Sequence, residues 1–450
     1  MVLTLPPPEA MPGNPYRAVQ DMVDGSLAYA SPAAVPVALP PGGVQFGAEA
    51  KRALFAIDAD VTFLNHGSYG ACPRPILDVQ RAYQDMMEKQ PVAFFHDVGP
   101  RIVDVVRRVA AYVNADAPGQ IALTSNATSA TACVLRSLPF NASSVIVSLD
   151  LGYNAVRNAI SEIVDRTGAR HHVAATRAPY TSQAIAAAVE QAIASYDRVD
   201  LVVVDHITSA TALVLPVHEI VALCHERGVQ VLVDGAHAVG QVPIDLKAMR
   251  PDFYVSNFHK WMMAPKSVSF LFVRDAAVRS KMRPTAVSHG HRQGFLAEFS
   301  WTGTMDFSAW LAVPACIEFH DRMGGRALMQ RNHDVCVKAA GTLADRWNTT
   351  LITDDDACRA GSMCVVELPH GLFPFRVGGD LQPGLLQSAL VVLHRVLLDE
   401  YHIECMPVVI ECRRPGIRIS VQMYNDEADF ERLGAAILDI VKRPVMTDHQ

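Results

Sequence analysis

Six short apolar runs constrain the fold more than any other feature of the sequence. They lie between residues 121 and 273 and read IALTS, SVIVSLD, RVDLVVVDH, GVQVLVDGA, FYVSN and SVSFLFV. Several are continuous and rich in β-branched residues, which is typical of strands covered on both faces. Stretches with apolar residues at helical spacing separate them. This alternation predicts an α/β domain with a mainly parallel sheet between helices.

The chain divides into three parts by composition. Residues 46–320 carry the alternation and predict a large α/β domain. Residues 321–450 hold the strand-like runs MCVVELP, IECMPVVIEC and GIRISVQMY between helical stretches, and predict a smaller α+β domain. Residues 1–45 are rich in Pro and Ala, with Arg17 as their only Lys or Arg. We expect them to form a disordered or surface-bound extension that is not a targeting peptide.

Charge and cysteine patterns exclude several classes of function. The net charge is −7 and no basic block occurs, which argues against nucleic acid or a membrane surface as the partner. No apolar run approaches the roughly 20 residues of a membrane span. The nine cysteines form no CxxC pair, and no HExxH-like motif is present. We therefore expect reduced thiols, no metal, and a cytoplasmic location.

Polar side chains follow five of the predicted strands closely. In parallel sheets, ligands bind beyond the carboxyl ends of the strands, so these side chains should meet at one edge. They are Asn126 and Thr128, Asp150 and Tyr153, His206, Asp234 and His237, and Asn257, His259 and Lys260.

Three features of this edge suit pyridoxal phosphate. The amine of Lys260 can form a Schiff base with the cofactor aldehyde. The carboxylate of Asp234 can hold the pyridine nitrogen protonated. The segment 125–135 predicts a helix of small residues directly after a strand, whose first N–H groups can bind the phosphate. Taken alone, Asp234 would be a helix cap or loop anchor and Lys260 a surface lysine; the cofactor accounts for both charges together.

Five separated motifs resemble the class V aminotransferase family of pyridoxal-phosphate enzymes. DGAH (234–237) and NFHKW (257–261) are similar to its Asp-x-x-His/Gln and His-Lys motifs. FLNHGSYGACP (63–73), DHITSATALVLPV (205–217) and WTGTMDFSAW (301–310) are most similar to the branch of isopenicillin N epimerases and plant-type L-cysteine desulfhydrases. The resemblance implies fold type I, with a mainly parallel seven-stranded sheet in the large domain and a smaller C-terminal α+β domain.

The resemblance also implies the cofactor contacts. Lys260 would be the Schiff-base lysine and move the proton at the substrate Cα, and Asp234 would pair with the pyridine nitrogen. His237 would bond near the cofactor 3-oxygen or the substrate, and Tyr153 would stack on the ring. The phosphate would be held by Ala127, Thr128, Asn257 and His259.

The remaining implied contacts concern the substrate and a second subunit. Arg418 would bind the substrate α-carboxylate, which suits a planar bidentate donor. His66 and Ser68 would lie near the substrate. Thr304 would reach the phosphate of a neighbouring subunit, so the resemblance implies a homodimer with shared active sites.

The cofactor permits several reactions, and the sequence leaves them open. We favour a C–S lyase that performs β-elimination on cysteine or a cysteine conjugate, on the strength of the branch resemblance. The alternatives are an amino-acid epimerase, a class V aminotransferase and a non-catalytic binding protein. Persulfide transfer is disfavoured, because Cys405 and Cys412 lie in a strand and tight turn rather than in a Gly-rich mobile loop.

Overall fold

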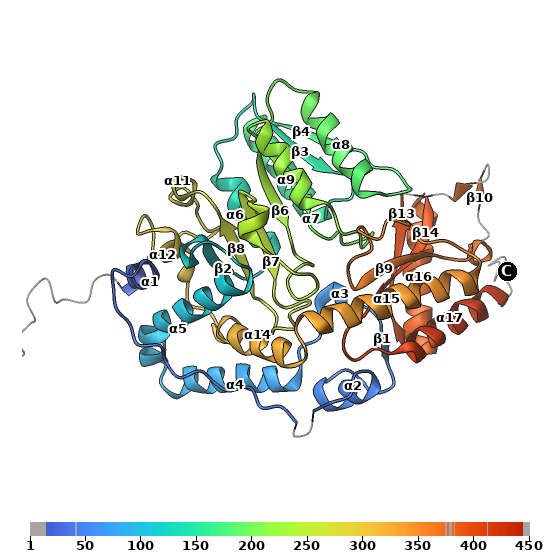
Figure 1. Cartoon of the computed structure of the whole chain (residues 1–450), viewed down its shortest axis with the longest axis horizontal. Coiled ribbons are helices and arrows are strands. Elements are labelled where there is room, and N and C mark those ends of the chain that lie inside the picture. The colour runs from blue at the N-terminus through green and yellow to red at the C-terminus, as the bar shows by residue number, and fades with distance from the viewer. Residues whose placement is uncertain are drawn as a thin grey trace, which may run out of the picture.

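The structure is a computed structural model that describes residues 15–40, 43–373, 376–377, 380–381, 383–411 and 413–443. A seven-stranded sheet forms the centre of the larger part of the molecule (Figure 1). In sheet order its strands are β2 (Ile121–Thr124), β8 (Ser269–Val273), β7 (Phe253–Asn257), β6 (Gln230–Asp234), β5 (Leu201–Asp205), β3 (Val145–Leu149) and β4 (Arg170–Ala174). Strand β8 runs antiparallel to both its neighbours, and the other neighbouring pairs are parallel. The predicted fold class is confirmed.

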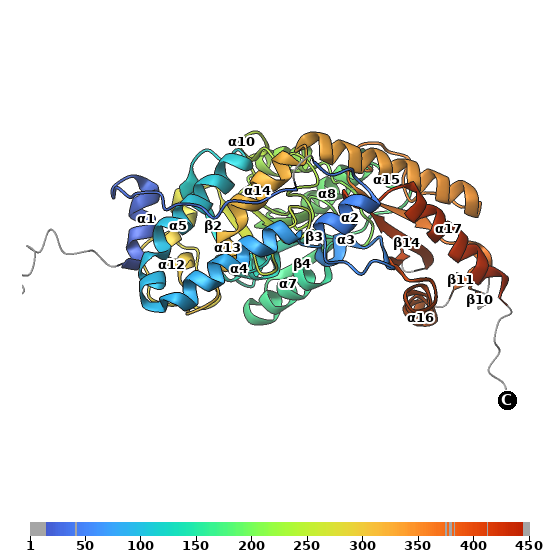
Figure 2. The same ribbon diagram turned by 90° about the horizontal axis from the view of Figure 1, so that it is seen from below.

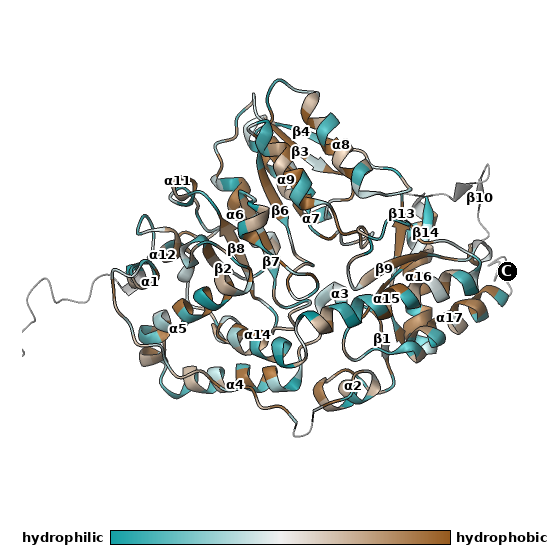
Figure 3. Cartoon of the chain, viewed as in Figure 1, coloured by the Kyte–Doolittle hydropathy of each residue, from teal (hydrophilic) through white to brown (hydrophobic). Residues whose placement is uncertain are grey.

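Helices cover both faces of this sheet, which explains why its inner strands are largely apolar, whereas the edge strand β4 reads RHHVA and is partly exposed. All five residues of β3, β5, β7 and β8 are buried, and Figure 3 shows the strands as the most hydrophobic ribbons. Figure 2 shows α7 and α8 on opposite sides of β3 and β4. The main helices of this part are α4 (Arg74–Lys89), α5 (Pro91–Tyr112), α6 (Ala127–Ser137), α7 (Asn154–Thr167), α8 (Ser182–Ala194), α9 (Val217–Glu226) and α14 (Val313–Arg322).

The C-terminal part is built on a three-stranded antiparallel sheet. Its order is β13 (Met406–Ile410), β14 (Arg414–Ser420) and β9 (Met363–Glu367). The sheet packs against α15 (Arg326–Trp347) and α16 (Pro383–Tyr401), and α17 (Glu427–Lys442) packs against α15. A second hydrophobic core fills this part. Within α15, Leu328 belongs to the first core and Cys336 to the second. The boundary between residues 320 and 321 stays a prediction.

Short elements complete the described chain. They are α2 (Ala48–Leu54), β1 (Thr62–Phe63), α3 (His66–Tyr69), η2 (Pro118–Gln120), α10 (Leu246–Met249), α11 (Ala276–Arg279), α12 (Phe295–Ser300), α13 (Ser308–Leu311), η3 (His370–Leu372), β10 (Arg376–Val377), β11 (Asp380–Leu381) and β12 (Ile403–Glu404). Strand β1 pairs in parallel with β12, which ties the early chain to the C-terminal part. Helix α3 follows β1 directly. In the part of the chain that the structure describes, no helix is long and apolar enough to cross a membrane.

Part of the N-terminal segment packs on the large domain. Within the described residues 15–40, α1 (Pro15–Asp24) packs against α5 and α12. Val19 and Met22, three positions apart on one helical face, are buried, and the Gln20 side chain accepts a hydrogen bond from the Leu296 N–H at 2.9 Å. In a segment so rich in Pro, the two apolar residues Val19 and Met22 do not by themselves predict a packed helix. Residues 1–14 and 41–42 lie outside the described part.

Candidate active site

The carboxyl ends of the central strands surround a cavity of about 140 Å³. Strand register explains the convergence, because β5 and β6 both end in an aspartate and Asp205 is the register partner of Asp234. In parallel strands, register partners project from the same side of the sheet. The predicted site residues that line the cavity are Ser68, Ala127, Thr128, Tyr153, Asp234, His237, Asn257, His259 and Lys260.

Helix α6 begins at the cavity with its first residues, Ala127 and Thr128. Asn126 caps the helix, and its side-chain oxygen accepts from the Ser129 N–H at 2.8 Å. The Ala127 N–H donates to Oδ1 of Asn257 at 2.9 Å, which fixes the helix start against the end of β7. A helix N-terminus that begins at a cavity suits a phosphate group.

Lys260 lines the cavity beside His237, with 3.0 Å between Nζ and the ring Nε2. Burial and, after it, the charge of Arg418 lower the pKa of Lys260 to about 8, although Asp234 and Asp205 oppose the shift. More neutral amine is therefore present near neutral pH than for an ordinary lysine, and a Schiff-base lysine needs this neutral form to attack an aldehyde.

A buried carboxylate pair occupies the strand-end side of the cavity. Asp234 is 4% exposed, and its Oδ1 accepts from the Ala236 N–H at 2.9 Å. Burial raises the pKa of Asp234, and burial together with the charge of Asp234 raises that of Asp205 well above its usual range. Neither carboxylate forms an ion pair with a described residue within 4.0 Å. A pyridine nitrogen that carries a proton would supply the missing positive partner.

Asp205 is a cavity residue that we did not select from the sequence. Its signal was present, because it ends an apolar strand just as Asp234 does and opens the DHITSATALVLPV motif. The cavity wall also includes Tyr69, Asn126, Ser209 and Ala236.

Arg418 lies directly behind the cavity wall and is fully buried in β14. One terminal nitrogen donates to the Ser209 carbonyl at 2.6 Å, and the other donates to Ser68 Oγ and Asn65 Oδ1, each at 3.0 Å. Its Nε has no hydrogen-bond partner among the described residues. Burial lowers the pKa of Arg418 to about 10. A buried guanidinium whose described partners are all neutral suits a carboxylate ligand.

Comparison with known proteins fits this geometry. The family model described as Aminotransferase class-V matches residues 72–433. The chain belongs to the class V aminotransferase family. Its cofactor is pyridoxal phosphate, and the residues present fit it: the Lys260 amine, the Asp234 carboxylate and the N-terminus of α6 are the three kinds of group that would hold it.

Relatives of this class V aminotransferase family member are of two kinds. It is 34% identical over 409 residues to a putative L-cysteine desulfhydrase 1 of Oryza sativa subsp. japonica, covering 85% of this chain and 84% of the relative. It is 29% identical over 406 residues to isopenicillin N epimerase of Streptomyces clavuligerus, covering 86% and 97%. A cystine C–S lyase solved with its product cysteine persulfide shares the fold, with a TM-score of 0.71, 21% identity and coverage of 85% and 98%.

Three predicted residues of this class V site do not line the cavity. Arg418 is separated from it by Ser68 and Ser209, as described above. His66 is fully buried, and its Nε2 lies 3.0 Å from the Lys260 carbonyl while its Nδ1 lies 2.7 Å from the Tyr424 hydroxyl. His66 therefore contacts the backbone of Lys260 and does not reach the cavity. Thr304 is exposed.

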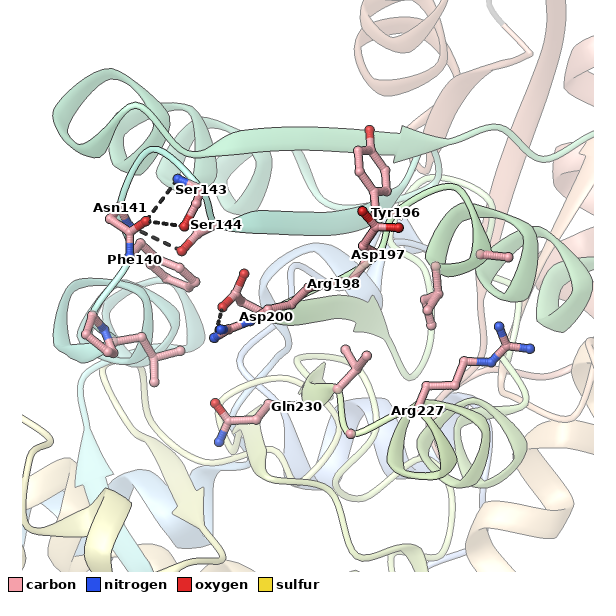
Figure 4. A pocket seen from close by; sticks show the side chains of 17 residues that line it. Phe140, Asn141, Ser143, Ser144, Tyr196, Asp197, Arg198, Asp200, Arg227 and Gln230 are labelled. Carbon is pink, nitrogen blue, oxygen red and sulfur yellow. Dashed lines mark hydrogen bonds and ion pairs between the residues drawn. The ribbon is translucent and has the colours of Figure 1, made fainter.

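A larger cavity, of about 790 Å³, lies away from these residues at the amino ends of β3, β5 and β6 (Figure 4). Both of its arginines have an acidic partner: Arg198 donates to Asp200 and Arg227 to Glu190, each at 2.7 Å. Asp200 also accepts from the Val145 N–H at 3.0 Å. In parallel α/β sheets the opposite edge binds ligands, so this cavity is not the class V cofactor site. No cluster of His, Cys, Asp or Glu that could hold a metal occurs among the described residues.

Proposed function

We propose that this protein is a C–S lyase that releases sulfide from L-cysteine or a cysteine conjugate. The observation that carries the proposal is the content of the cavity. It offers a partly neutral Lys260 amine, and the Arg418 guanidinium, which has no acidic partner among the described residues, lies just behind its wall. No cysteine occurs among the described residues that line the cavity. Such a site can remove a Cα proton and hold a carboxylate, but it has no thiol that could accept sulfur.

In this proposal each residue has a separate role in the reaction. Bound pyridoxal phosphate supplies an electron sink for negative charge at the substrate Cα. Arg418 would hold the α-carboxylate, aided by Ser68, and Lys260 would take the Cα proton as general base. The Cβ–S bond then breaks and the electron pair leaves with sulfur. The overall reaction converts cysteine and water into pyruvate, ammonia and hydrogen sulfide.

Cysteine placement argues against persulfide transfer. Cys405 is fully buried, and burial raises the pKa of its thiol well above its usual range. Because the thiolate is the nucleophile, such a thiol is unreactive. Cys412, the other candidate, lies outside the described residues.

The relatives support the lyase and also supply the main alternative. Proteins named L-cysteine desulfhydrase are 33–34% identical to this chain. Relatives named isopenicillin N epimerase are 29% identical, and an epimerase would use the same Lys260, Asp234 and Arg418. Reprotonation of Cα on the opposite face would then replace loss of sulfide.

We further propose a homodimer with shared active sites and a cytoplasmic location. Thr304 is exposed and follows Trp301, which packs on Phe95 and Phe307 with ring centroids 5.7 Å apart in each case. This aromatic packing would hold the segment after Trp301 at the surface, where Thr304 could contact a second subunit. A monomeric mass in solution would contradict the shared site. One relative is described as chloroplastic, so fractionation of the native cells tests the location.

Product analysis tests the reaction. The purified protein, loaded with pyridoxal phosphate, is incubated with L-cysteine, and sulfide, pyruvate and alanine are measured. Equal amounts of sulfide and pyruvate support the lyase, whereas sulfide with alanine would indicate a desulfurase and refute it. If no product forms, exchange of the substrate Cα hydrogen for deuterium would favour the epimerase or aminotransferase. A protein that binds no pyridoxal phosphate would overturn the enzyme assignment.

A further inference from the structure

A buried hydrogen-bond chain runs from Trp261 through His237 to Lys260. Trp261 is 1% exposed, and its indole Nε1–H donates to Nδ1 of His237 at 3.4 Å. His237 is 2% exposed, and its Nε2 lies 3.0 Å from Nζ of Lys260. Both ring nitrogens of His237 therefore have a partner within the chain.

These partners determine which nitrogen of His237 carries the hydrogen. An indole N–H can only donate, so Nδ1 of His237 must accept. A neutral imidazole has a single N–H, and it must then lie on Nε2. In this tautomer Nε2–H donates to Lys260 when its amine is neutral, the form that predominates above about pH 8.

A doubly protonated His237 is disfavoured by its surroundings. Burial is the largest cause that holds the pKa of His237 well below its usual range, and the charges of Lys260, Arg418, His259 and His66 act in the same direction. A protonated ring would also place a hydrogen on Nδ1, opposite the indole N–H. The ring is thus neutral at physiological pH.

The backbone holds Trp261 and His237 together closely. Gly240 has a φ of +84°, and a Cβ there would lie 2.6 Å from both the Trp261 carbonyl carbon and the Met262 nitrogen. The turn that follows His237 therefore lies directly against the Trp261 backbone. The Gln241 side chain donates to the His237 carbonyl at 2.6 Å and so fixes the other end of this turn.

We propose that Trp261 is a positioning residue that acts through its indole N–H. It holds His237 in the tautomer with hydrogen on Nε2, and so keeps a hydrogen-bond donor directed at the Lys260 side of the cavity. The consequence for the cofactor rests on the assignment of Lys260 as the cofactor-binding lysine. A donor at this place stabilises an anionic cofactor oxygen, and it thereby lowers the pKa measured from the visible absorbance of the bound cofactor.

Measuring the effect of Trp261→Phe in two backgrounds distinguishes a change of the His237 tautomer from a change of packing. Trp261→Phe removes the N–H and keeps an aromatic ring, and His237→Gln provides an amide donor that has no tautomer to select. In the wild-type background we expect Trp261→Phe to raise the absorbance pKa by about 0.5 to 1 pH unit, the size of one hydrogen bond. In the His237→Gln background the same substitution should leave it nearly unchanged. Equal shifts in both backgrounds would overturn the proposal.

The tautomer can also be measured without cofactor or substrate. Nitrogen NMR of the apoprotein labelled with ¹⁵N-histidine, recorded above about pH 9 so that the Lys260 amine is neutral, reports which ring nitrogen is protonated, and the signal lost in His237→Gln identifies His237. We expect hydrogen on Nε2 in the wild type, and hydrogen on Nδ1 or a mixture in Trp261→Phe. Hydrogen on Nδ1 in the wild type would refute the proposal.

This second measurement keeps the proposal separate from the proposed function. A protein that lacks C–S lyase activity, or that binds no pyridoxal phosphate, still reports the tautomer of His237. If Trp261→Phe does not fold, benzothienylalanine at position 261 preserves the ring shape with sulfur in place of the N–H. The shift of hydrogen away from Nε2 is expected for that variant too, and its absence would contradict the proposal.

Discussion

Gly70 is the position where a single methyl group should damage the site most directly. It has φ +69° and ψ 162°, and it faces the backbone of His259 and Lys260. A Cβ at Gly70 would lie 2.2 Å from the His259 carbonyl oxygen and 3.0 Å from Cα of Lys260. Gly70→Ala must therefore displace this backbone or the end of α3 by about 1 Å, because ordinary contacts begin above 3.4 Å.

The expected cost has two parts. An alanine in this backbone region, which only glycine adopts readily, costs about 1–3 kcal/mol, and the overlap adds about 1–3 kcal/mol as overpacking does in a dense core. We expect Gly70→Ala to lose about 4 kcal/mol of unfolding free energy, a large share of the usual 5–15 kcal/mol. Displacement of Lys260 should also lower turnover by about 100-fold.

Urea unfolding of the apoprotein measures the first effect, as a lower midpoint with an unchanged slope. Cofactor absorbance and the rate of sulfide release measure the second. Gly341→Ala is the matched control, because Gly341 lies within α15 with open space around its Cβ position, and alanine there should stabilise the helix by about 0.5–1 kcal/mol. A Gly70→Ala protein with wild-type stability and turnover would refute the reasoning.

Three further predictions concern the charged groups of the site. Asp234→Asn should retain cofactor but lose turnover by orders of magnitude, because the pyridine nitrogen loses the carboxylate that keeps it protonated; near-native sulfide release would contradict this. Arg418→Lys should raise the KM for cysteine about 10- to 100-fold with a smaller change in kcat, because an ammonium cannot form the paired bonds of a guanidinium; steady-state kinetics with an unchanged KM would exclude Arg418 as the carboxylate ligand. The rate at which pyridoxal phosphate binds covalently to the apoprotein should rise with pH and level off above about 8, since only the neutral Lys260 amine reacts. In Arg418→Met this midpoint should move to higher pH, because the cation that lowers the lysine pKa is gone, and a midpoint that stays in place would refute the coupling.

Much of the site was predictable because its polar residues directly follow the apolar runs that predict strands. Asp234, Asn257 and Lys260 each follow an apolar run, and a parallel sheet brings such ends to one edge whatever the loops do. The start of α6 at Ala127 was predictable for the same reason. The family resemblance then added Arg418, whose distance along the chain gives no local signal. The structure brings it within hydrogen-bond distance of Ser68, 350 residues away.

Other features depend on contacts that no local pattern encodes. The stripe of Val19 and Met22 in α1 is too short to predict a packed helix, and it is buried only because α5 and α12 provide apolar partners. His66 carried the same family motif as Ser68, yet the fold turned it beneath the Lys260 backbone while Ser68 reached the cavity. Adjacent residues in a short helix point in different directions, and the sequence alone does not say which one faces the ligand.

The sequence by itself determined the mainly parallel sheet, the edge at which the chemistry gathers and the identity of the cofactor, because hydrophobic period and strand-end chemistry are local properties. Only the tertiary structure decided that Asp205 joins Asp234, that Arg418 lacks a described carboxylate partner, and that the Trp261 indole N–H meets His237. Those properties arise where separate strands and loops meet in a space without bulk water. There, the balance between burial and a few hydrogen bonds sets the charge and tautomer of each group.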